Sequence, residues 1–170
     1  MKAKGYSLWL MPTGETYDRL SGLIGRLARE YGAPLFEPHV TLIGEVVQSE
    51  QDVLRKVEQL ASGQKPFTIK LNKVDYQDFY FRTLFARADK TNPLQALHDR
   101  AKEVFEMRDI PDYMPHLSLL YGNFSKIIKE QIIESIGRDQ AVEFMVNSIY
   151  VFKTDGEVNT WYKVKELPLL

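Results

Sequence analysis

The sequence contains no cysteine, only three histidines and no long apolar run. Without cysteine, disulfides, thiolate nucleophiles and cysteine-ligated zinc sites are all excluded, which suits a reducing cytoplasm. Because no apolar stretch approaches the roughly 18–20 residues that span a bilayer, we expect no membrane association. The N-terminal stretch MKAKGYSLWLMP has no small-residue cleavage pattern, so it predicts a first strand rather than a signal peptide. We therefore expect a cytoplasmic protein.

An excess of charge of one sign is also lacking, since 22 basic residues face 23 acidic ones and the formal net charge is −1. Proteins that bind long nucleic acids carry a basic surface that neutralises many phosphates. The balance of charge therefore argues against long nucleic acid as a partner. A small phosphate-bearing ligand still fits, because a single phosphate needs only a local cluster of donors.

What is present is the composition of one globular domain. The apolar share of 44% and the charged share of 26% are typical of globular proteins. A length of 170 residues suits one ordinary domain or two small lobes with a common core. No low-complexity linker separates the halves, so we expect residues 1–170 to form a single bilobal domain and the protein to be a monomer.

Hydrophobic periodicity predicts an alternation of strands and helices along the chain. Apolar residues that recur on one face predict helices, whose ends are marked by Gly32, by Ser49 and Gly63, by Asn92-Pro93, and by Ser125. Ser49 precedes Asp52 by three residues and predicts an N-cap close to a capping box. Aromatic and β-branched residues predict strands at 6–11, 67–76, 79–87, around 142–153 and at 161–164.

Two octapeptides are nearly the same, PHVTLIGE at 38–45 and PHLSLLYG at 115–122. Their histidines, His39 and His116, are separated by 77 residues (116 − 39), and each segment is followed by a predicted helix and strands. This order indicates a weak internal duplication. Two such halves predict an α+β fold with two sheets that face each other.

Each histidine segment places an imidazole and a hydroxyl on one face of a strand. Residues i and i+2 of a strand project from the same side, so His39 points with Thr41, and His116 points with Ser118. The residues between them point the opposite way and anchor each strand in the core. Across a cleft, the two strands would present two imidazoles and two hydroxyls to one ligand.

This set of side chains suits the hydrolysis of a cyclic phosphodiester. The reaction needs a base that activates water and an acid that protonates the leaving ribose oxygen, and two imidazoles with pKa values of about 6.5 can serve both roles. Hydroxyl donors can stabilise the charge that gathers on the non-bridging oxygens. No metal or other cofactor is required, and two histidines without a third converging ligand make a poor metal site.

A structural role is the main alternative for any single His-x-Thr/Ser pair, because such an imidazole often bonds a backbone carbonyl and short motifs match by chance. Two copies that share the preceding proline and a following leucine, in a chain with three histidines, favour a functional role instead. The third histidine, His98, lies in the predicted helix LQALHDRAK without a hydroxyl partner. It is interpreted as a helix-face residue outside the site.

The paired motifs resemble those of the 2H phosphoesterase superfamily, which carries one His-x-Thr/Ser motif in each half of a duplicated fold. Three segments narrow the resemblance to the cyclic phosphodiesterases of plants and yeast: YSLWLMP at 6–12, FEPHVTL at 36–42 and YMPHLSLLYG at 113–122. The similarity extends in order over most of the chain and is weakest beyond Gly137.

The resemblance implies a bilobal, LigT-like α+β fold, with two antiparallel sheets flanked by helices around a central cleft. It also implies hydrolysis of ADP-ribose 1'',2''-cyclic phosphate to ADP-ribose 1''-phosphate, and of nucleoside 2',3'-cyclic phosphates to 2'-phosphates. On this basis His39 and His116 are the acid–base pair, and Thr41 and Ser118 bind the phosphate. Either histidine can be the base; His116 is favoured.

Three aromatic residues are implied as substrate-binding residues by the same resemblance. Tyr121 matches a tyrosine that lines the family's cleft, Trp9 an aromatic on the first strand, and Phe81 one on the central hairpin. For Trp9 and Phe81 a core role is an equal alternative, since large aromatics fill both cores and pockets. Arg82 departs from the family pattern, and it bears on the preference for pyrophosphate-bearing substrates only if it faces the cleft.

Two other functions stay open at this point. One is an RNA-end enzyme similar to the bacterial 2'-5' RNA ligase-like proteins, which would need a basic groove that the balanced charge does not favour. The other is a non-catalytic nucleotide-binding module, against which the two intact pairs of histidine and hydroxyl argue. Turnover of a nucleoside cyclic phosphate, compared with that of an RNA carrying the same terminus, separates the two enzyme functions. Nucleotide binding without turnover from pH 5 to 8 would indicate the binding module.

Overall fold

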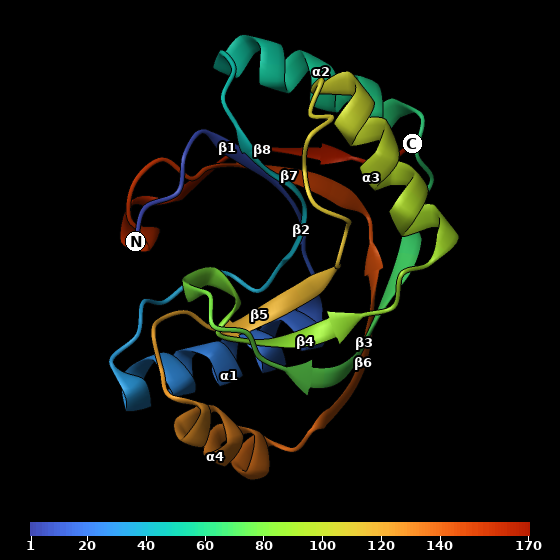
Figure 1. The fold of residues 1–170 in the computed structure, drawn as a ribbon. Helices are drawn as coiled ribbons and strands as arrows, with labels where there is room; N and C mark the ends of the chain where they lie inside the picture. Colours follow the sequence, from blue (N-terminus) through green and yellow to red (C-terminus); the bar gives the residue numbers. More distant parts are fainter.

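The computed structural model describes residues 1–170 and contains one curled antiparallel sheet of eight strands, covered by four helices (Figure 1). The strands are β1 Tyr6–Leu10, β2 Val40–Val46, β3 Phe67–Asp75, β4 Leu84–Ala88, β5 His116–Leu120, β6 Asp139–Val146, β7 Ser148–Lys153 and β8 Tyr162–Pro168. The helices are α1 Gly14–Tyr31, α2 Glu50–Ser62, α3 Asn92–Val104 and α4 Lys126–Ile136, and two short 3-10 helices are η1 Tyr80–Arg82 and η2 Val158–Thr160.

The sheet consists of two four-stranded halves that meet at the two histidine strands. Its strand order is β6-β3-β4-β5-β2-β1-β7-β8. β2 and β5 pair at a single position, Val40 with Leu117, whereas the neighbouring pairs within each half are joined over several residues. The expected α+β architecture of two antiparallel sheets with flanking helices is thus confirmed, with the two sheets joined at their edges into one.

The internal duplication is visible in the order of the elements. The series β1-α1-β2-α2 corresponds to β4-α3-β5-α4. The strand order shows the same correspondence when it is followed outward from the centre of the sheet. One half is β2-β1-β7-β8, and the other half is β5-β4-β3-β6. Helix α1 connects two strands of one half and packs on β5 and β6 of the other, while α3 packs mainly on β2. These crossed helices tie the two halves together.

The core lies between the sheet and the helices that cover its outer side, with α2 and α3 at one end and α1 and α4 at the other (Figure 1). The predicted apolar faces are buried, as shown by Leu20, Ile24 and Leu27 of α1 and by Val53 and Val57 of α2. Each such side chain contributes about 1.5–3 kcal/mol when it is removed from water. None of the four helices has the length and apolar character needed to cross a membrane.

Local sequence signals mark most helix ends as predicted. Gly32 ends α1 in the left-handed conformation at φ 63°, which costs glycine little because it has no Cβ. Ser49 caps α2 by accepting a hydrogen bond from the Asp52 amide at 3.2 Å. In α3 the N-cap is Thr91 rather than Asn92, so that Pro93 lies in the first turn.

The region 79–87 does not form the full strand that was predicted. β4 begins only at Leu84, and residues 80–82 form the 3-10 helix η1. The Thr83 hydroxyl donates to the carbonyl of Gly122, and the Gly122 amide donates to the carbonyl of Tyr80 at 3.0 Å. These bonds to the end of β5 turn the chain, although its aromatic residues are typical of a strand. Phe81 therefore lies in a tight turn beside the sheet and not on a central hairpin strand.

Candidate active site

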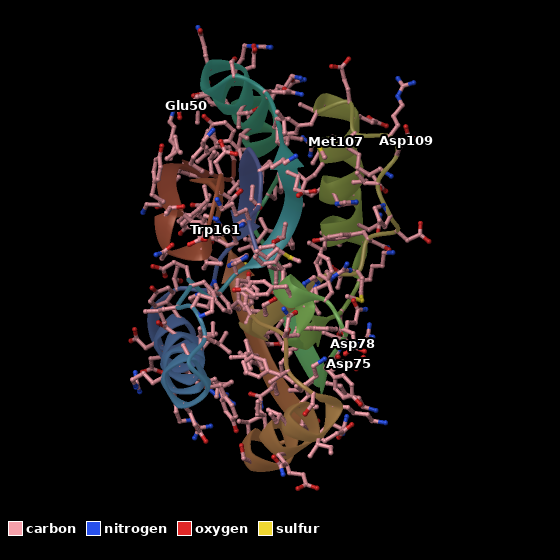
Figure 2. The ribbon with its side chains drawn as sticks, turned by 60° about the vertical axis from the view of Figure 1, so that its left-hand side comes forward. Glu50, Asp75, Asp78, Met107, Asp109 and Trp161 are labelled. Atoms are coloured by element: carbon pink, nitrogen blue, oxygen red, sulfur yellow. The ribbon has the colours of Figure 1, made fainter.

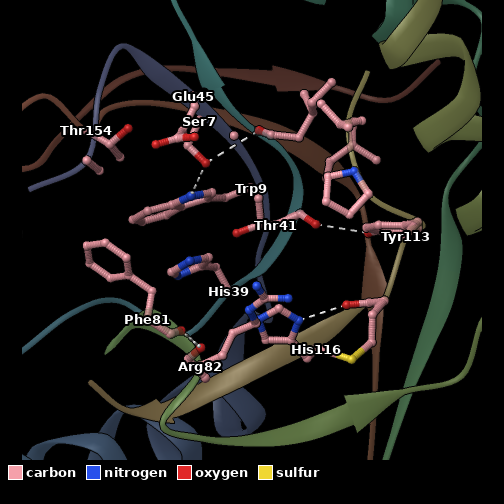
Figure 3. A pocket seen from close by; sticks show the side chains of 18 of the residues that line it. Ser7, Trp9, His39, Thr41, Glu45, Phe81, Arg82, Tyr113, His116 and Thr154 are labelled. Atoms are coloured by element: carbon pink, nitrogen blue, oxygen red, sulfur yellow. Dashed lines mark hydrogen bonds between the residues drawn. The ribbon is translucent and has the colours of Figure 1, made fainter. Parts of the chain in front are cut away.

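A cavity of about 490 Å³ opens where the two halves of the sheet meet. His39 and Thr41 of the first histidine segment and His116 of the second line it (Figure 3). Ser118 of the second segment lines it as well. The three aromatic residues expected at the site line it as well: Trp9, Phe81 and Tyr121. The structure therefore brings all seven predicted site residues into one cleft.

The His39 imidazole is packed tightly in the wall of this cleft. Its Nδ1 lies 2.6 Å from the carbonyl oxygen of Glu37, and its ring stacks on Trp9 with the ring centroids 3.6 Å apart and the planes at 6°. A proton on Nδ1 for this bond leaves Nε2 as the unprotonated atom. His39 is only 5% exposed, and this burial is the main reason why its pKa is lowered to about 3. The bond to the Glu37 carbonyl raises the pKa, and the nearby His116 lowers it further.

The His116 imidazole is held in the same way on the second strand. Its Nδ1 lies 2.8 Å from the carbonyl oxygen of Met114, so Nε2 is again the free atom. Burial lowers the pKa of His116, and the positive charges of Arg82 and Arg87 lower it further. Both imidazoles are thus neutral at pH 7, each oriented by the carbonyl two residues before it.

The two hydroxyls of the motifs differ in their partners. The Thr41 hydroxyl makes no hydrogen bond to the protein, although the Thr41 carbonyl accepts one from the Tyr113 hydroxyl at 3.0 Å. The Ser118 hydroxyl donates to the carbonyl of Phe81 at 3.1 Å and is buried. Thr41 is therefore free to donate to a ligand, whereas Ser118 must release the Phe81 carbonyl to do so.

The aromatic residues of the cleft also belong to the packed interior. Trp9 is 2% exposed, and its indole nitrogen donates to the Ser7 hydroxyl at 2.8 Å. Tyr121 is buried and stacks on Phe36 with the ring centroids 3.8 Å apart. Phe81 is half-buried. Trp9 is therefore both a core residue and a cleft residue, because one face of its buried ring packs on His39 in the wall of the cavity.

Trp161 is a cleft residue that the sequence did not identify. It follows η2 and lies at the waist between the two halves of the molecule (Figure 2). Its ring centroid is 6.1 Å from that of Trp9, 5.8 Å from that of Phe81 and 6.2 Å from that of Tyr121. The only signal in the sequence is that Trp161 is one of two tryptophans, in the region where the resemblance to the family is weakest.

His98 and Tyr113 form a second layer behind the first histidine strand. His98 lies on the buried face of α3, where its Nδ1 is 2.8 Å from the carbonyl of Leu42 and its ring stacks on Tyr113 at 3.8 Å. Both side chains contribute to the wall of the cavity, so the interpretation of His98 as a residue outside the site was wrong, although it does lie on a helix face. Through its bond to the Thr41 carbonyl, Tyr113 of the second motif segment contacts the first motif directly.

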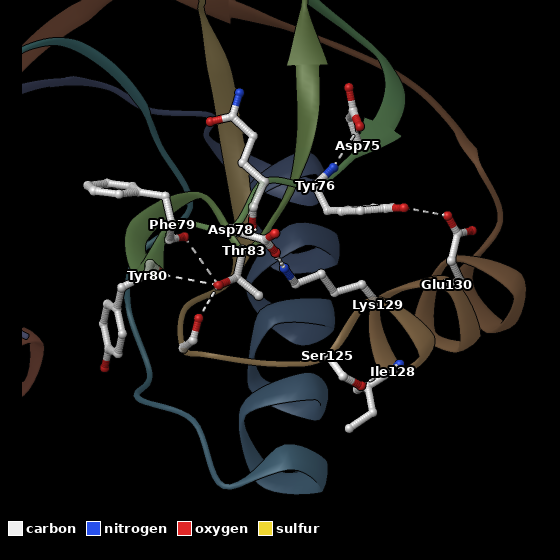
Figure 4. Close-up of polar contacts among 12 residues, drawn as sticks. Asp75, Tyr76, Asp78, Phe79, Tyr80, Thr83, Ser125, Ile128, Lys129 and Glu130 are labelled. Atoms are coloured by element: carbon white, nitrogen blue, oxygen red, sulfur yellow. Dashed lines mark hydrogen bonds and ion pairs between the residues drawn. The ribbon is translucent and has the colours of Figure 1, made fainter.

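A buried lysine anchors the loop that carries Phe81 and Arg82 (Figure 4). Lys129 of α4, with its side chain 2% exposed, donates to the carbonyl of Gln77 at 3.0 Å and to the carboxylate of Asp78 at 2.6 Å. Asp78 itself is exposed, so the lysine and not the carboxylate is the buried partner. Because η1 begins two residues after Asp78, these bonds fix where Phe81 and Arg82 enter the cleft.

The donor set of the cleft offers no site of the usual composition for a zinc ion. Zinc sites in proteins use at least three converging ligands of the histidine, cysteine or carboxylate types. No group of three such side chains exists in the structure. The two histidines are thus a pair of titratable groups rather than part of a larger ligand set.

Comparison with known proteins agrees with this geometry. Residues 16–157 match the model of the 2'-5' RNA ligase superfamily. A cyclic phosphodiesterase of Arabidopsis thaliana is 28% identical over 171 residues, covering 96% of this chain and 94% of the relative.

Solved structures show the same fold at low sequence identity. TT0787 of Thermus thermophilus superposes with a TM-score of 0.69 at 16% identity, covering 97% of each chain. E. coli LigT complexed with 3'-AMP superposes with a TM-score of 0.64 at 11% identity, covering 99% of each chain. The chain therefore belongs to the 2'-5' RNA ligase superfamily, that of the 2H phosphoesterases, and has their LigT-like fold.

Proposed function

We propose that the protein is a cyclic phosphodiesterase in which His39 and His116 are the acid–base pair. The observation that carries this proposal is the convergence of two imidazoles on one cavity, each with Nδ1 bonded to a backbone carbonyl and Nε2 free. The similarity to a cyclic phosphodiesterase of Arabidopsis thaliana supports the same class of reaction.

In the proposed reaction His116 acts as the base. Its Nε2 accepts a proton from water while the water oxygen forms a bond to phosphorus. The bond from phosphorus to one ring oxygen breaks, and His39 donates a proton to that oxygen. Burial favours the neutral form that His116 needs as a base, and the bound phosphate anion raises the pKa of His39 so that it can carry a proton.

Thr41 and Ser118 bind the phosphate in this scheme. The free hydroxyl of Thr41 donates to a non-bridging oxygen, and the Ser118 hydroxyl exchanges the Phe81 carbonyl for another. A donor that is free to orient toward the developing charge, as the Thr41 hydroxyl is, contributes about 3 kcal/mol to catalysis. Tyr121, Trp9 and Phe81 form apolar walls that bind the nucleoside part of the substrate.

The proposed substrates are small cyclic phosphates of nucleotides. Nucleoside 2',3'-cyclic phosphates would be opened to 2'-phosphates, and ADP-ribose 1'',2''-cyclic phosphate to ADP-ribose 1''-phosphate. A cavity of about 490 Å³ lies within the size range of small-ligand sites. Both halves of the site come from one chain, so we propose that residues 1–170 act as one domain and as a monomer. We also propose that the protein acts in the cytoplasm.

A panel of cyclic phosphates tests the proposal, with the products identified by phosphorus NMR. Nucleoside 2',3'-cyclic phosphates should give 2'-phosphates at a rate that is unchanged by EDTA. Loss of turnover on chelation would refute the metal-independent mechanism. Turnover only of RNA that carries the same terminus would instead establish an RNA-end enzyme, and binding without turnover from pH 5 to 8 would establish a nucleotide-binding module.

A further inference from the structure

Arg82 is a cationic residue of the cleft without a counter-ion in the protein. It lines the same cavity as the two histidines, and Figure 3 shows its guanidinium beside the imidazole of His116. It takes part in none of the ion pairs of the structure, and its side chain donates no hydrogen bond to the protein. Arg82 is half-buried as a residue, and its guanidinium N–H groups, which no protein group accepts from, are available to a ligand in the cavity.

Arg87, the other arginine near His116, has a structural explanation that Arg82 lacks. Its guanidinium forms a two-point ion pair with Asp75, at 2.5 and 2.8 Å from the same carboxylate oxygen. Arg87 does not line the cavity. Both arginines lower the pKa of His116, but only Arg82 lines the cavity and can contact a ligand there.

The position of Arg82 is fixed by the turn that carries it. Its amide donates to the carbonyl of Phe79 at 2.9 Å, and its carbonyl accepts from the amide of Gln77 at 3.0 Å. Its guanidinium carbon lies 4.8 Å from the centroid of the Phe79 ring, within the range of a cation–π contact. Together with the Lys129 anchor, these contacts hold Arg82 in place before a ligand binds.

We infer that Arg82 binds the reacting phosphate, by donating hydrogen bonds to its non-bridging oxygens while the phosphate lies between His39 and His116. This inference rests on the proposed function and adds a cationic donor to it. Arginine is suited to the role because its planar guanidinium pairs with two oxygens of a phosphate at once. When water adds to phosphorus, negative charge grows on those oxygens, and a fixed cation beside them stabilises the transition state.

A second phosphate elsewhere in the substrate is the alternative ligand for Arg82. A pyrophosphate-bearing substrate would place such a group away from the reacting centre. The position of Arg82 beside His116 favours the reacting phosphate instead (Figure 3). Two substrates separate these roles: adenosine 2',3'-cyclic phosphate, whose only phosphate is the reacting one, and the same compound with an added 5'-phosphate.

The test compares Arg82→Gln, Arg82→Lys and Arg87→Gln on these two substrates. We expect Arg82→Gln to lower kcat by roughly 10²-fold on both, as is typical for loss of one donor to a developing oxyanion. Arg82→Lys should restore part of the loss, and Arg87→Gln should stay within a few-fold of wild type. Both Gln variants should move the His116 limb of the pH–rate profile to higher pH, because each removes a nearby positive charge.

Two kinetic results would overturn the inference: equal effects of Arg82→Gln and Arg87→Gln, or a loss confined to the 5'-phosphorylated substrate. A wild-type protein without turnover would refute the proposed function instead. The role of Arg82 would then be decided by titration with inorganic phosphate, followed by phosphorus NMR. Weaker binding in Arg82→Gln than in Arg87→Gln supports the inference, and equal binding refutes it.

Discussion

Acid should destabilise this protein in part by forcing a proton onto His39. The ordinary pKa of the imidazole is 6.5, and burial against Trp9 lowers it to about 3 in the folded protein. Between these two values the unfolded chain binds a proton that the folded protein does not, so the free energy of unfolding decreases as the pH falls. The contribution of His39 is complete above the unfolded pKa and is lost progressively toward pH 3.

The size of this effect follows from the two pKa values. Between pH 7 and pH 4.5 the linkage relation gives a loss of about 2.5 kcal/mol from His39 alone. The pKa values of His98 and His116 are lowered too, and their contributions have the same sign. A substitution at His39 therefore separates the contribution of His39 from the rest of the loss in the free energy of unfolding at low pH.

Urea unfolding followed by circular dichroism measures this share, with wild type and His39→Asn each studied at pH 7 and pH 4.5. Asparagine keeps a donor for the Glu37 carbonyl and removes the titratable group. Any loss of stacking on Trp9 cancels, because only the change with pH is compared. Wild type should lose about 2.5 kcal/mol more than the variant on acidification. Equal losses would show that His39 is not held neutral by burial.

Two further changes test how the cleft is positioned. Lys129→Met should release the loop before η1 and raise KM more than it lowers kcat. The reason is that Lys129 contacts Gln77 and Asp78 but no reacting group. An unchanged KM in steady-state kinetics would contradict this. Tyr113→Phe removes the bond to the Thr41 carbonyl and should cost about 1 kcal/mol of transition-state stabilisation, a roughly five-fold fall in kcat with the fold intact by circular dichroism. A wild-type kcat would show that Tyr113 does not position Thr41.

The parts of the fold that sequence predicted are those set by local chemistry. Ser49 bonds the amide of Asp52 three residues later, and Gly32 adopts the left-handed conformation that glycine favours. The alternation within the octapeptides correctly placed Val40 and Leu117 in the core and His39 and His116 on the opposite side, lining the cavity. In each case the signal lies within a few residues of the structure that it predicts.

The parts that sequence did not predict depend on contacts between distant segments. Residues 79–83 have the aromatic composition of a strand, yet Gly122 and Lys129, some forty residues or more along the chain, hold them in a turn. The same turn decides that Arg82 faces the cleft. Trp161 reaches the site only because β8 pairs with β7 and brings its start beside Phe81. No local pattern carries this information.

In the proposed mechanism two histidines, one from each half of the sheet, act as a pair on one phosphate. The most direct test is the rate at which wild type, His39→Ala and His116→Ala hydrolyse adenosine 2',3'-cyclic phosphate across pH 5 to 8. Wild type should give a bell-shaped pH dependence, and each substitution should abolish most turnover by removing an acid or a base, an effect of roughly 10²–10⁴-fold. Near-normal turnover in either variant would contradict the paired mechanism.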